Sequence, residues 1–146
     1  MESQIRALEL PNPEIKIRPV RLTDVQELHA TCWSDRPQAI IHQLISRAQQ
    51  YAIQGRGLGV VVVGEGGALI GFGQLTVWPR CGEISDLIIR DDQRSRGLGT
   101  TIIQYLVRVS REMHLPCVEI GAALSNPRAV ALYRRLGFMD IHQIEI

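Results

Sequence analysis

Hydrophobic positions change their period along the chain. After an alternating stretch at residues 14–18, they recur every three or four positions in two segments that end near Trp33 and Gln54, which predicts two helices. From Leu58 to Arg90, three strand-like runs rich in β-branched residues are separated by two glycine-containing turns. This central part of the chain is therefore predicted to be an antiparallel meander of three strands.

Helical spacing returns in the second half, with apolar residues at Leu98, Ile102, Leu106, Val109 and Met113. Residues 117–122 then form an apolar run, and because a helix separates it from the strand at residues 83–90, the two strands can pair in parallel. A short helix with Pro127 in its first turn and a last strand at residues 138–146 complete the pattern. We expect an α/β (α+β) fold: a mixed, mostly antiparallel central sheet of about six strands with a parallel pair and four flanking helices.

The length of 146 residues fits one domain, with residues 14–146 as the folded unit. Residues 1–13 contain two prolines and little periodicity, so we expect a flexible N-terminal lead-in. The net charge of +1 argues against nucleic acid or an anionic membrane as the main partner. No segment approaches the roughly twenty apolar residues of a membrane span, and no leader is evident, so we expect a cytoplasmic protein.

The three cysteines, Cys32, Cys81 and Cys117, are far apart and match no zinc-binding spacing with the histidines. We therefore expect three reduced, buried thiols and no bound metal.

The stretch Glu83–Thr101 combines an apolar strand, a charged turn and Arg-Gly-Leu-Gly at the start of a helix. Unpaired backbone N–H groups and the positive end of the helix dipole make such a turn a candidate anion site, to which Arg94 and Arg96 add charge. A P-loop is excluded because Thr100, not lysine, follows Gly99, and the third glycine of a dinucleotide-binding turn is missing. A tight connection without a ligand is the alternative interpretation.

Two sequence runs together are more specific: RSRGLG at residues 94–99 after the strand residues 87–89, and SNPRAVALYRRLGF at residues 125–138. They resemble the acetyl-CoA signature and the Asn, Leu-Tyr, Leu-Gly-Phe segment of the GNAT superfamily of N-acetyltransferases. The order of predicted elements agrees with this family over residues 15–146. The resemblance implies that the strand before the signature is splayed from its parallel neighbour.

The resemblance also implies acetyl-CoA as cosubstrate. Its pyrophosphate would lie on the backbone N–H groups of the signature turn: Arg94, Ser95, Arg96, Gly97, Leu98, Gly99 and Thr100. Backbone groups of Leu87, Ile88 and Ile89 would bond the pantetheine arm. Asn126 matches a CoA-contacting asparagine and is equally suited to cap the following helix. Arg128, Arg134 and Arg135 are candidates for the 3'-phosphate or are solvated helix residues.

The implied activity is transfer of the acetyl group to a primary amine of a small molecule or peptide, by direct attack in a ternary complex. Tyr133 stands where the family places the acid that protonates the CoA thiolate; otherwise it is a core aromatic residue. An ammonium must lose a proton before it attacks, and Glu83 is favoured over Glu119 as the base, directly or through water. Alternation places Glu83 with Ser85 and Leu87 on one face and Asp86 on the other. Either glutamate could instead be a surface residue.

The chain departs from most members of this family because it ends eight residues after Phe138. We expect the acceptor site to be walled by residues 33–38 or by a second subunit paired along the last strand, which would make a homodimer. A non-catalytic acyl-CoA-binding sensor on the same fold is the second functional hypothesis. A nucleotide-binding domain with a chance signature is the third.

Overall fold

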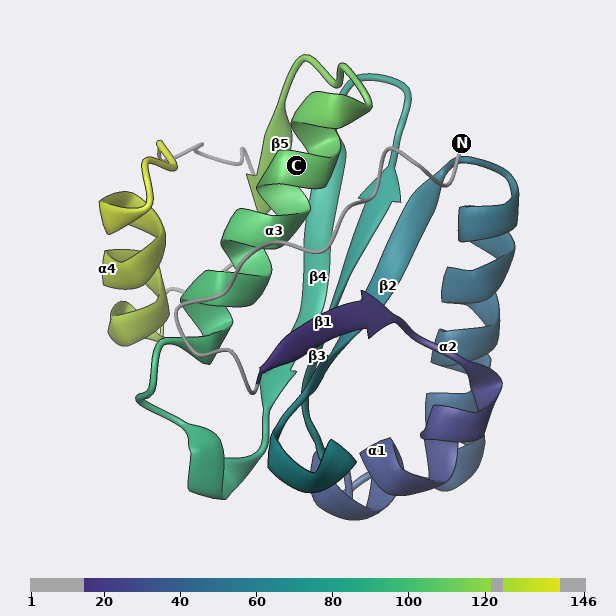
Figure 1. Cartoon of the computed structure of the whole chain (residues 1–146). Helices are drawn as coiled ribbons and strands as arrows, with labels where there is room; N and C mark the ends of the chain where they lie inside the picture. Colours follow the sequence, from purple (N-terminus) through teal and green to yellow (C-terminus); the bar gives the residue numbers. More distant parts are fainter. Residues whose placement is uncertain (1–14, 122–124, 140–146) are drawn as a thin grey trace.

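The computed structural model describes residues 15–121 and 125–139, and its elements form a five-stranded sheet in the order β1-β2-β3-β4-β5. The strands are β1 (Lys16–Pro19), β2 (Gly57–Val63), β3 (Leu69–Val77), β4 (Gly82–Ile89) and β5 (Val118–Ile120). The helices are α1 (Val25–Thr31), α2 (Gln38–Ile53), α3 (Leu98–Glu112) and α4 (Pro127–Arg135), with 3₁₀ turns η2 (Leu22–Asp24), η3 (Glu65–Gly67) and η4 (Asp91–Gln93). Figure 1 shows their arrangement.

The sheet is mixed, as expected. Strands β1 to β4 pair antiparallel with their neighbours, and β4 pairs in parallel with β5 through Gly82↔Val118, Glu83↔Glu119 and Ile84↔Ile120. The predicted meander, parallel pair and four helices are all present, so the expected fold class is confirmed. Five strands lie within the described residues; the predicted lead-in and most of the predicted last strand fall outside them.

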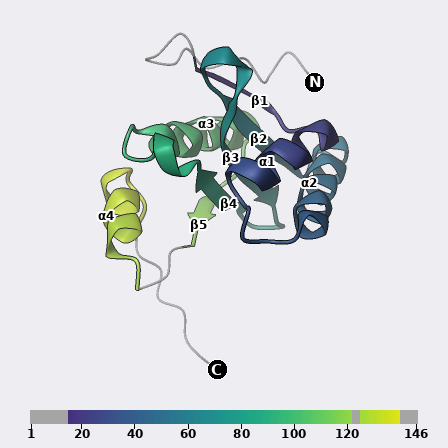
Figure 2. The ribbon, with the colours of Figure 1, turned by 90° about the horizontal axis from the view of Figure 1, so that it is seen from below.

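Helices cover the two faces of the sheet, with α3 on one side and α1 and α2 on the other (Figures 1 and 2). On the α3 side, Ile102, Ile103 and Leu106 are essentially fully buried against strand residues such as Val60 and Ile84. On the other side, Leu28 of α1 and Ile45 of α2 pack with Val61 and Phe72. Each face of the sheet thus has its own hydrophobic core.

Two glycines in β3 bring α3 close to the sheet. A Cβ atom at Gly73 would lie 2.6 Å from Ile102 Cγ2, and one at Gly71 would lie 2.9 Å from Ile89 Cδ1 and 3.2 Å from the Ile88 carbonyl oxygen. Neither position therefore has room for a side chain. The Ile102 side chain of α3 thus packs directly over these two glycines, which fixes the start of α3 against β3.

The prediction of three reduced thiols is wrong, because the structure joins Cys81 and Cys117 in a disulfide. Cys81 immediately precedes β4 and Cys117 immediately precedes β5, and the parallel pairing of Gly82 with Val118 places the two cysteines side by side, with Cα atoms 4.8 Å apart. Their separation of 36 positions hides this proximity in the sequence. Cys32 is the free cysteine, and burial raises the pKa of its thiol.

None of the helices built from the described residues has the length and apolar character needed to cross a bilayer.

Candidate active site

The middle of β4 contains a β-bulge centred on Asp86. Phe72 pairs with Ile88 and Gln74 with Ser85, so β3 contributes one residue between these pairs and β4 contributes two, Asp86 and Leu87. Asp86 has φ of +56°, a left-handed conformation that aspartate tolerates better than most residues. The bulge bends the strand at the point where a ligand would have to enter the sheet.

The parallel partner ends just before this bulge. β5 pairs with β4 as far as Ile84, while β4 runs on to Ile89, and no further β5 pairing occurs within the described residues. Leu87, Ile88 and Ile89, the residues expected to meet the pantetheine arm, lie in the part of β4 that pairs with β3 on one side and has no β5 partner among the described residues on the other. The edge of β4 is thus open to an added extended group, as expected for a splayed pair.

The turn after β4 leads into α3 through two left-handed residues, Ser95 with φ of +64° and Gly97 with φ of +80°. The first backbone hydrogen bond of the helix joins the Thr101 N–H to the Gly97 carbonyl at 3.0 Å, so the N–H groups of Leu98, Gly99 and Thr100 have no intrahelical acceptor. Space lies in front of them, since a Cβ at Gly99 would meet only Leu87 Cδ2, at 4.0 Å. We call residues 95–100 the anion cradle.

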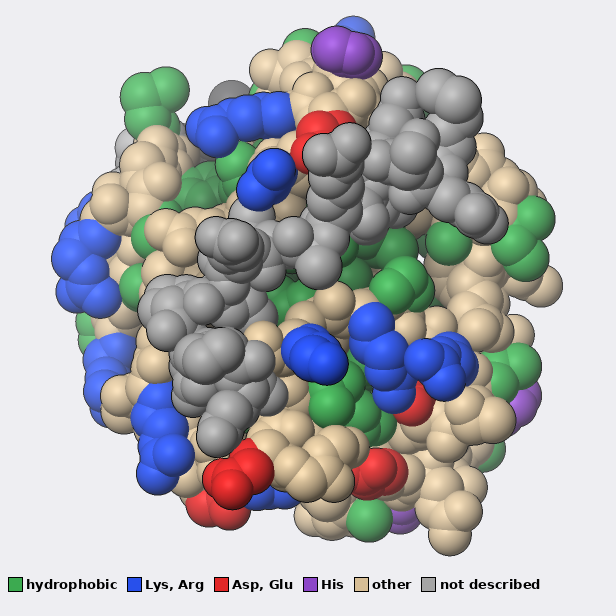
Figure 3. Space-filling view, viewed as in Figure 1, with side chains coloured by type: hydrophobic (Ala, Val, Ile, Leu, Met, Phe, Trp, Pro, Cys, Tyr) green, Lys and Arg blue, Asp and Glu red, His purple; other side chains and the backbone are tan. Residues whose placement is uncertain are grey.

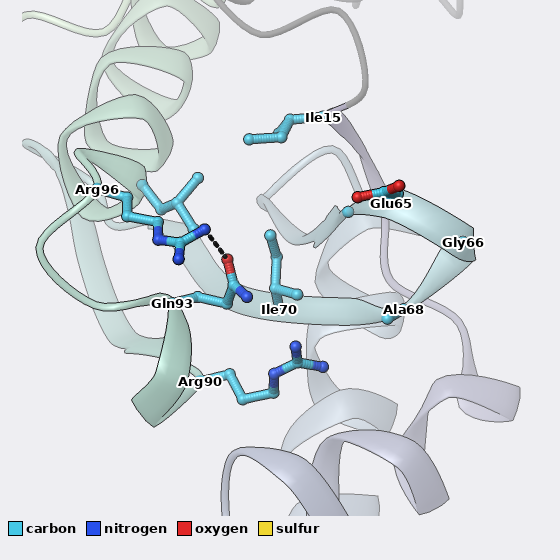
Figure 4. Close-up of a pocket in the computed structure, with 10 residues that line it drawn as sticks. Ile15, Glu65, Gly66, Ala68, Ile70, Arg90, Gln93 and Arg96 are labelled. Carbon is cyan, nitrogen blue, oxygen red and sulfur yellow. Dashed lines mark hydrogen bonds between the residues drawn. The ribbon is translucent and has the colours of Figure 1, made fainter.

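The two arginines of the turn are exposed and already have partners. Arg94 forms an ion pair with Asp91 at 3.0 Å, and the Arg96 guanidinium donates to Gln93 Oε1 at 3.4 Å. Arg96 also lines a cavity of about 430 Å³ beside the cradle, with Ile15, Glu65, Ile70, Arg90 and Gln93 (Figure 4). Both arginines would have to leave these partners to bind an anion. The backbone N–H groups of the cradle can bind one without any rearrangement.

α4 contributes the two predicted site residues of the second motif. Asn126 caps the helix, accepting the Ala129 N–H on Oδ1 at 3.2 Å, and its side-chain NH₂ has no partner among the described residues. Tyr133 is half-buried and packs edge-on against Phe138 with ring centroids 6.3 Å apart; burial raises the pKa of its phenol. In the described part of the chain its hydroxyl forms no hydrogen bond. Arginine side chains gather over α4 (Figure 3), where Arg128, Arg134 and Arg135 are exposed.

The two candidate bases lie side by side. Glu83 and Glu119 are partners in the β4–β5 register, so their side chains leave the same face of the sheet, opposite to the α3 side to which Ile84 points. Glu83 is half-buried and accepts the Trp78 indole N–H at 3.0 Å, whereas Glu119 is exposed. The structure therefore brings both predicted carboxylates together and gives Glu83 the better-fixed position.

Two expectations from alternation are wrong because of the bulge. Leu87 faces α3, within 3.3 Å of a Cβ at Gly73, and does not share a face with Glu83 and Ser85. Asp86 does not point to the opposite face: its Oδ2 accepts hydrogen bonds from Ser85 Oγ and Gln74 Nε2, both at 3.3 Å. Gln74 is the cross-strand partner of Ser85, so the Asp86 carboxylate lies on the Glu83 side.

Sequence reasoning missed Trp78 and Gln74 on this face. Alternation along β3 from Phe72, which points to the α1 and α2 side, could have placed Gln74 there. Its contact with Asp86 depends on the bulge and has no signal in the sequence.

The described residues contain no group of three or more His, Cys, Asp or Glu side chains that could hold a metal ion. They do fit acetyl-CoA: the cradle is open to an anion, and the edge of β4 is free for an extended arm. The mixed sheet, the parallel pair that separates at the bulge and the open helix start agree with the fold that the resemblance to the GNAT acetyltransferases implies. The model of the acetyltransferase (GNAT) family matches residues 22–138, and the chain belongs to this family.

Curated relatives match over part of their length. A segment of 50 residues is 38% identical to the L-methionine sulfoximine/L-methionine sulfone acetyltransferase of Pseudomonas aeruginosa, covering 34% of this chain and 29% of that protein. Another segment, of 63 residues, is 36% identical to the mycothiol acetyltransferase of Corynebacterium jeikeium, and it covers 43% of this chain and 18% of that protein. The matched segments thus span less than a third of either relative.

Solved structures share the fold over nearly the whole chain. An aminoglycoside N-acetyltransferase in complex with CoA superposes with a TM-score of 0.75 at 13% identity, covering 94% of this chain and 97% of that one. The glucosamine-6-phosphate N-acetyltransferase of Arabidopsis thaliana has a TM-score of 0.67 at 17% identity, covering 90% and 95%. At these identities the likeness shows the fold alone.

Proposed function

We propose that this protein transfers the acetyl group of acetyl-CoA to a primary amine of a small molecule. The observation that carries the proposal is the opening of the β4–β5 pair at the Asp86 bulge, directly before the anion cradle. One end of this opening fits an extended thioester arm and the other fits its pyrophosphate. Family membership supports the same donor.

On the donor side, the N–H groups of the cradle would bind the pyrophosphate, and the free edge of Leu87 to Ile89 would bond the pantetheine amides. The side-chain oxygen of Asn126 caps α4, which leaves its NH₂ group to donate to the same ligand. Acetyl-CoA supplies an acetyl group activated as a thioester.

On the acceptor side, Glu83 would take the proton of the ammonium, directly or through water, with Glu119 as the alternative base. An alkyl ammonium has a pKa of about 10, so this proton must leave before the nitrogen can attack the thioester carbon. The nitrogen bonds to the thioester carbon, the C–S bond breaks, and the CoA thiolate takes the phenolic proton of Tyr133. The second proton that the nitrogen loses as it becomes an amide restores the phenol, directly or through water. Burial raises the pKa of Tyr133, so the phenol is protonated at neutral pH and can donate.

Relatives support the choice of a small-molecule acceptor. The names of the similar proteins include acetyltransferases for methionine sulfone and for aminoglycosides, both of which carry amines. A peptide acceptor, a homodimer paired along the last strand and a cytoplasmic location stay predictions.

Release of CoA thiol from acetyl-CoA tests the activity. We expect the protein to release CoA with at least one member of a panel of aminoglycosides, amino acids, diamines and short peptides. Binding of acetyl-CoA with no release of thiol by any amine would favour the alternative, a non-catalytic acyl-CoA sensor.

A variant of Gly99 tests the donor site. An aspartate fits the open space at this position and suits the first turn of a helix, but its carboxylate would repel a pyrophosphate. We expect CoA to raise the melting temperature of the wild-type protein and of Gly99→Asn, but not of Gly99→Asp. Stabilisation by NAD or ATP in place of CoA would contradict the assignment and favour a nucleotide-binding domain.

A further inference from the structure

Asp86 is an exposed carboxylate that the proposed transfer reaction does not use. The bulge turns it onto the same face as Glu83, and the Ser85 and Gln74 side chains hold its Oδ2 atom at 3.3 Å each. Its Oδ1 atom has no partner among the described residues. A carboxylate that is oriented on one oxygen and open on the other is arranged to receive a cationic donor.

Gln74 gives an independent sign of a missing ligand. Gln74 is 9% exposed, its Nε2 donates to Asp86, and its Oε1 is buried without a hydrogen-bond partner among the described residues. Reversing the amide would set Oε1 against the carboxylate, so Asp86 fixes this orientation. A buried acceptor left without a donor is unfavourable, and such groups are uncommon in folded proteins unless a ligand or water completes them.

Neither Glu83 nor Asp86 forms an ion pair with a Lys or Arg side chain in the described structure. Their polar partners are the neutral groups of Trp78, Ser85 and Gln74. This face of β4 therefore carries uncompensated negative charge next to the proposed acceptor position, which would attract a cation.

We propose that the acceptor is a primary amine with a second cationic group, and that Asp86, oriented by Gln74, binds that second group while the first amine lies at Glu83. This inference rests on the proposed function and names the substrate class of the same site. Glu83 and Asp86 are three positions apart, at most about 10 Å along an extended strand. A compact diamine spans this separation, and its N–H donors match the free Asp86 Oδ1, while the Gln74 amide holds the other oxygen of the same carboxylate.

Calorimetric titration of the CoA-saturated protein with cadaverine and with aminopentanol tests the proposal. The two probes have the same chain length, but a hydroxyl replaces the second amine in aminopentanol. We expect cadaverine to bind about tenfold more tightly to the wild-type protein, the amount that a hydrogen bond to a charged group contributes. In Asp86→Asn this preference should disappear, and in Gln74→Leu it should shrink.

Asn tolerates the left-handed conformation at residue 86, so Asp86→Asn should fold normally, which circular dichroism checks. Glu112→Gln, which removes one negative charge from the end of α3, is the matched control and should keep the full preference. Equal binding of both probes to the wild-type protein, or an unchanged preference in Asp86→Asn, would overturn the inference. Because the titration measures binding, a cadaverine preference without CoA release would reject the transfer reaction and retain the cation site.

Discussion

At the residue scale, Tyr133 has the features of a proton donor. It is half-buried, burial raises the pKa of its phenol above the ordinary 10.0, and its hydroxyl has no hydrogen-bond partner among the described residues. A tyrosine that only filled the core would gain stability from a partner for its hydroxyl. Within the described residues the hydroxyl has no partner, and it lies on the helix capped by Asn126, the proposed CoA-contacting residue, which fits a group that meets its partner only during the reaction.

Tyr133→Phe should therefore lower kcat by about a hundredfold and leave the affinity for acetyl-CoA unchanged. This factor is at the lower end of the rate enhancements that general acid catalysis gives, because CoA already leaves readily as the thiolate. Because the pKa of Tyr133 is raised, wild-type activity should fall at the alkaline end only above pH 10.0, and the variant should lack this fall. Steady-state kinetics against pH measure both effects, and equal kcat values would remove Tyr133 from the mechanism. Tyr51→Phe, on α2, is the matched control and should behave as wild type.

Single side chains were predicted well where local chemistry decides their position and poorly where the bulge does. Asn126 could be predicted as a helix cap because the residue before Pro127 was the right type at the right place. The faces of Asp86 and Leu87 could not, because one extra residue in β4 reverses the alternation after Ser85. The hydrogen bond from Gln74 to Asp86 follows from that reversal, so the sequence gives no sign of it.

At the scale of elements, the contact of α3 with β3 sets the position of the anion cradle. Leu98, at the first position of α3, is buried, and Ile102, one turn later, packs over Gly73 of β3. Because the first residues of α3 belong to the anion cradle, any shift of the helix relative to the sheet also shifts the cradle. The close approach of these two elements thus links the stability of the fold to the geometry of the donor site.

Gly73→Ala should test this link. The new Cβ would lie 2.6 Å from Ile102 Cγ2, so α3 must shift, and overpacking of this kind costs about 1–3 kcal/mol of the free energy of unfolding. Urea denaturation measures the loss, and calorimetry with CoA should show weaker binding in the same variant. Gly121→Ala, where a new Cβ meets nothing within 4 Å, is the control and should change stability little. Wild-type stability in Gly73→Ala would show that α3 is not held by this contact.

The elements themselves were predictable, because their hydrophobic periods are long and their glycines and prolines mark the boundaries. The helices at residues 38–53 and 98–112 agree with the expected segments, as do the three strands of the meander. The parallel pairing of β4 with β5 also followed from the helix between them. The length of that pairing, which within the described residues stops at Ile84, depends on backbone geometry that the sequence pattern does not encode.

At the scale of the whole molecule, the sheet lies between the two proposed sites. α3 and α4 cover the side proposed for the donor, whereas Glu83, Asp86 and Glu119 leave the opposite face, so the opening between β4 and β5 would be the passage between them. The residues that close the other end of this opening are Cys81 and Cys117, whose disulfide joins the starts of the two strands. The bond thus lies where β4 and β5 are paired, away from the end where they separate.

Breaking this disulfide should destabilise the protein and loosen the base of the opening. The bond closes a loop of about 36 residues, for which loop entropy gives a loss of about 3–4 kcal/mol in the free energy of unfolding. Urea denaturation with and without reductant measures this loss of free energy. The Cys32→Ser variant is used so that the free thiol of Cys32 cannot exchange with the disulfide. Thiol titration of the denatured, unreduced wild-type protein should find one reactive cysteine, Cys32. Three reactive cysteines, with no effect of reductant on stability, would show that the bond does not form. If it does form, CoA binding should persist after reduction, because the anion cradle lies at the far end of β4.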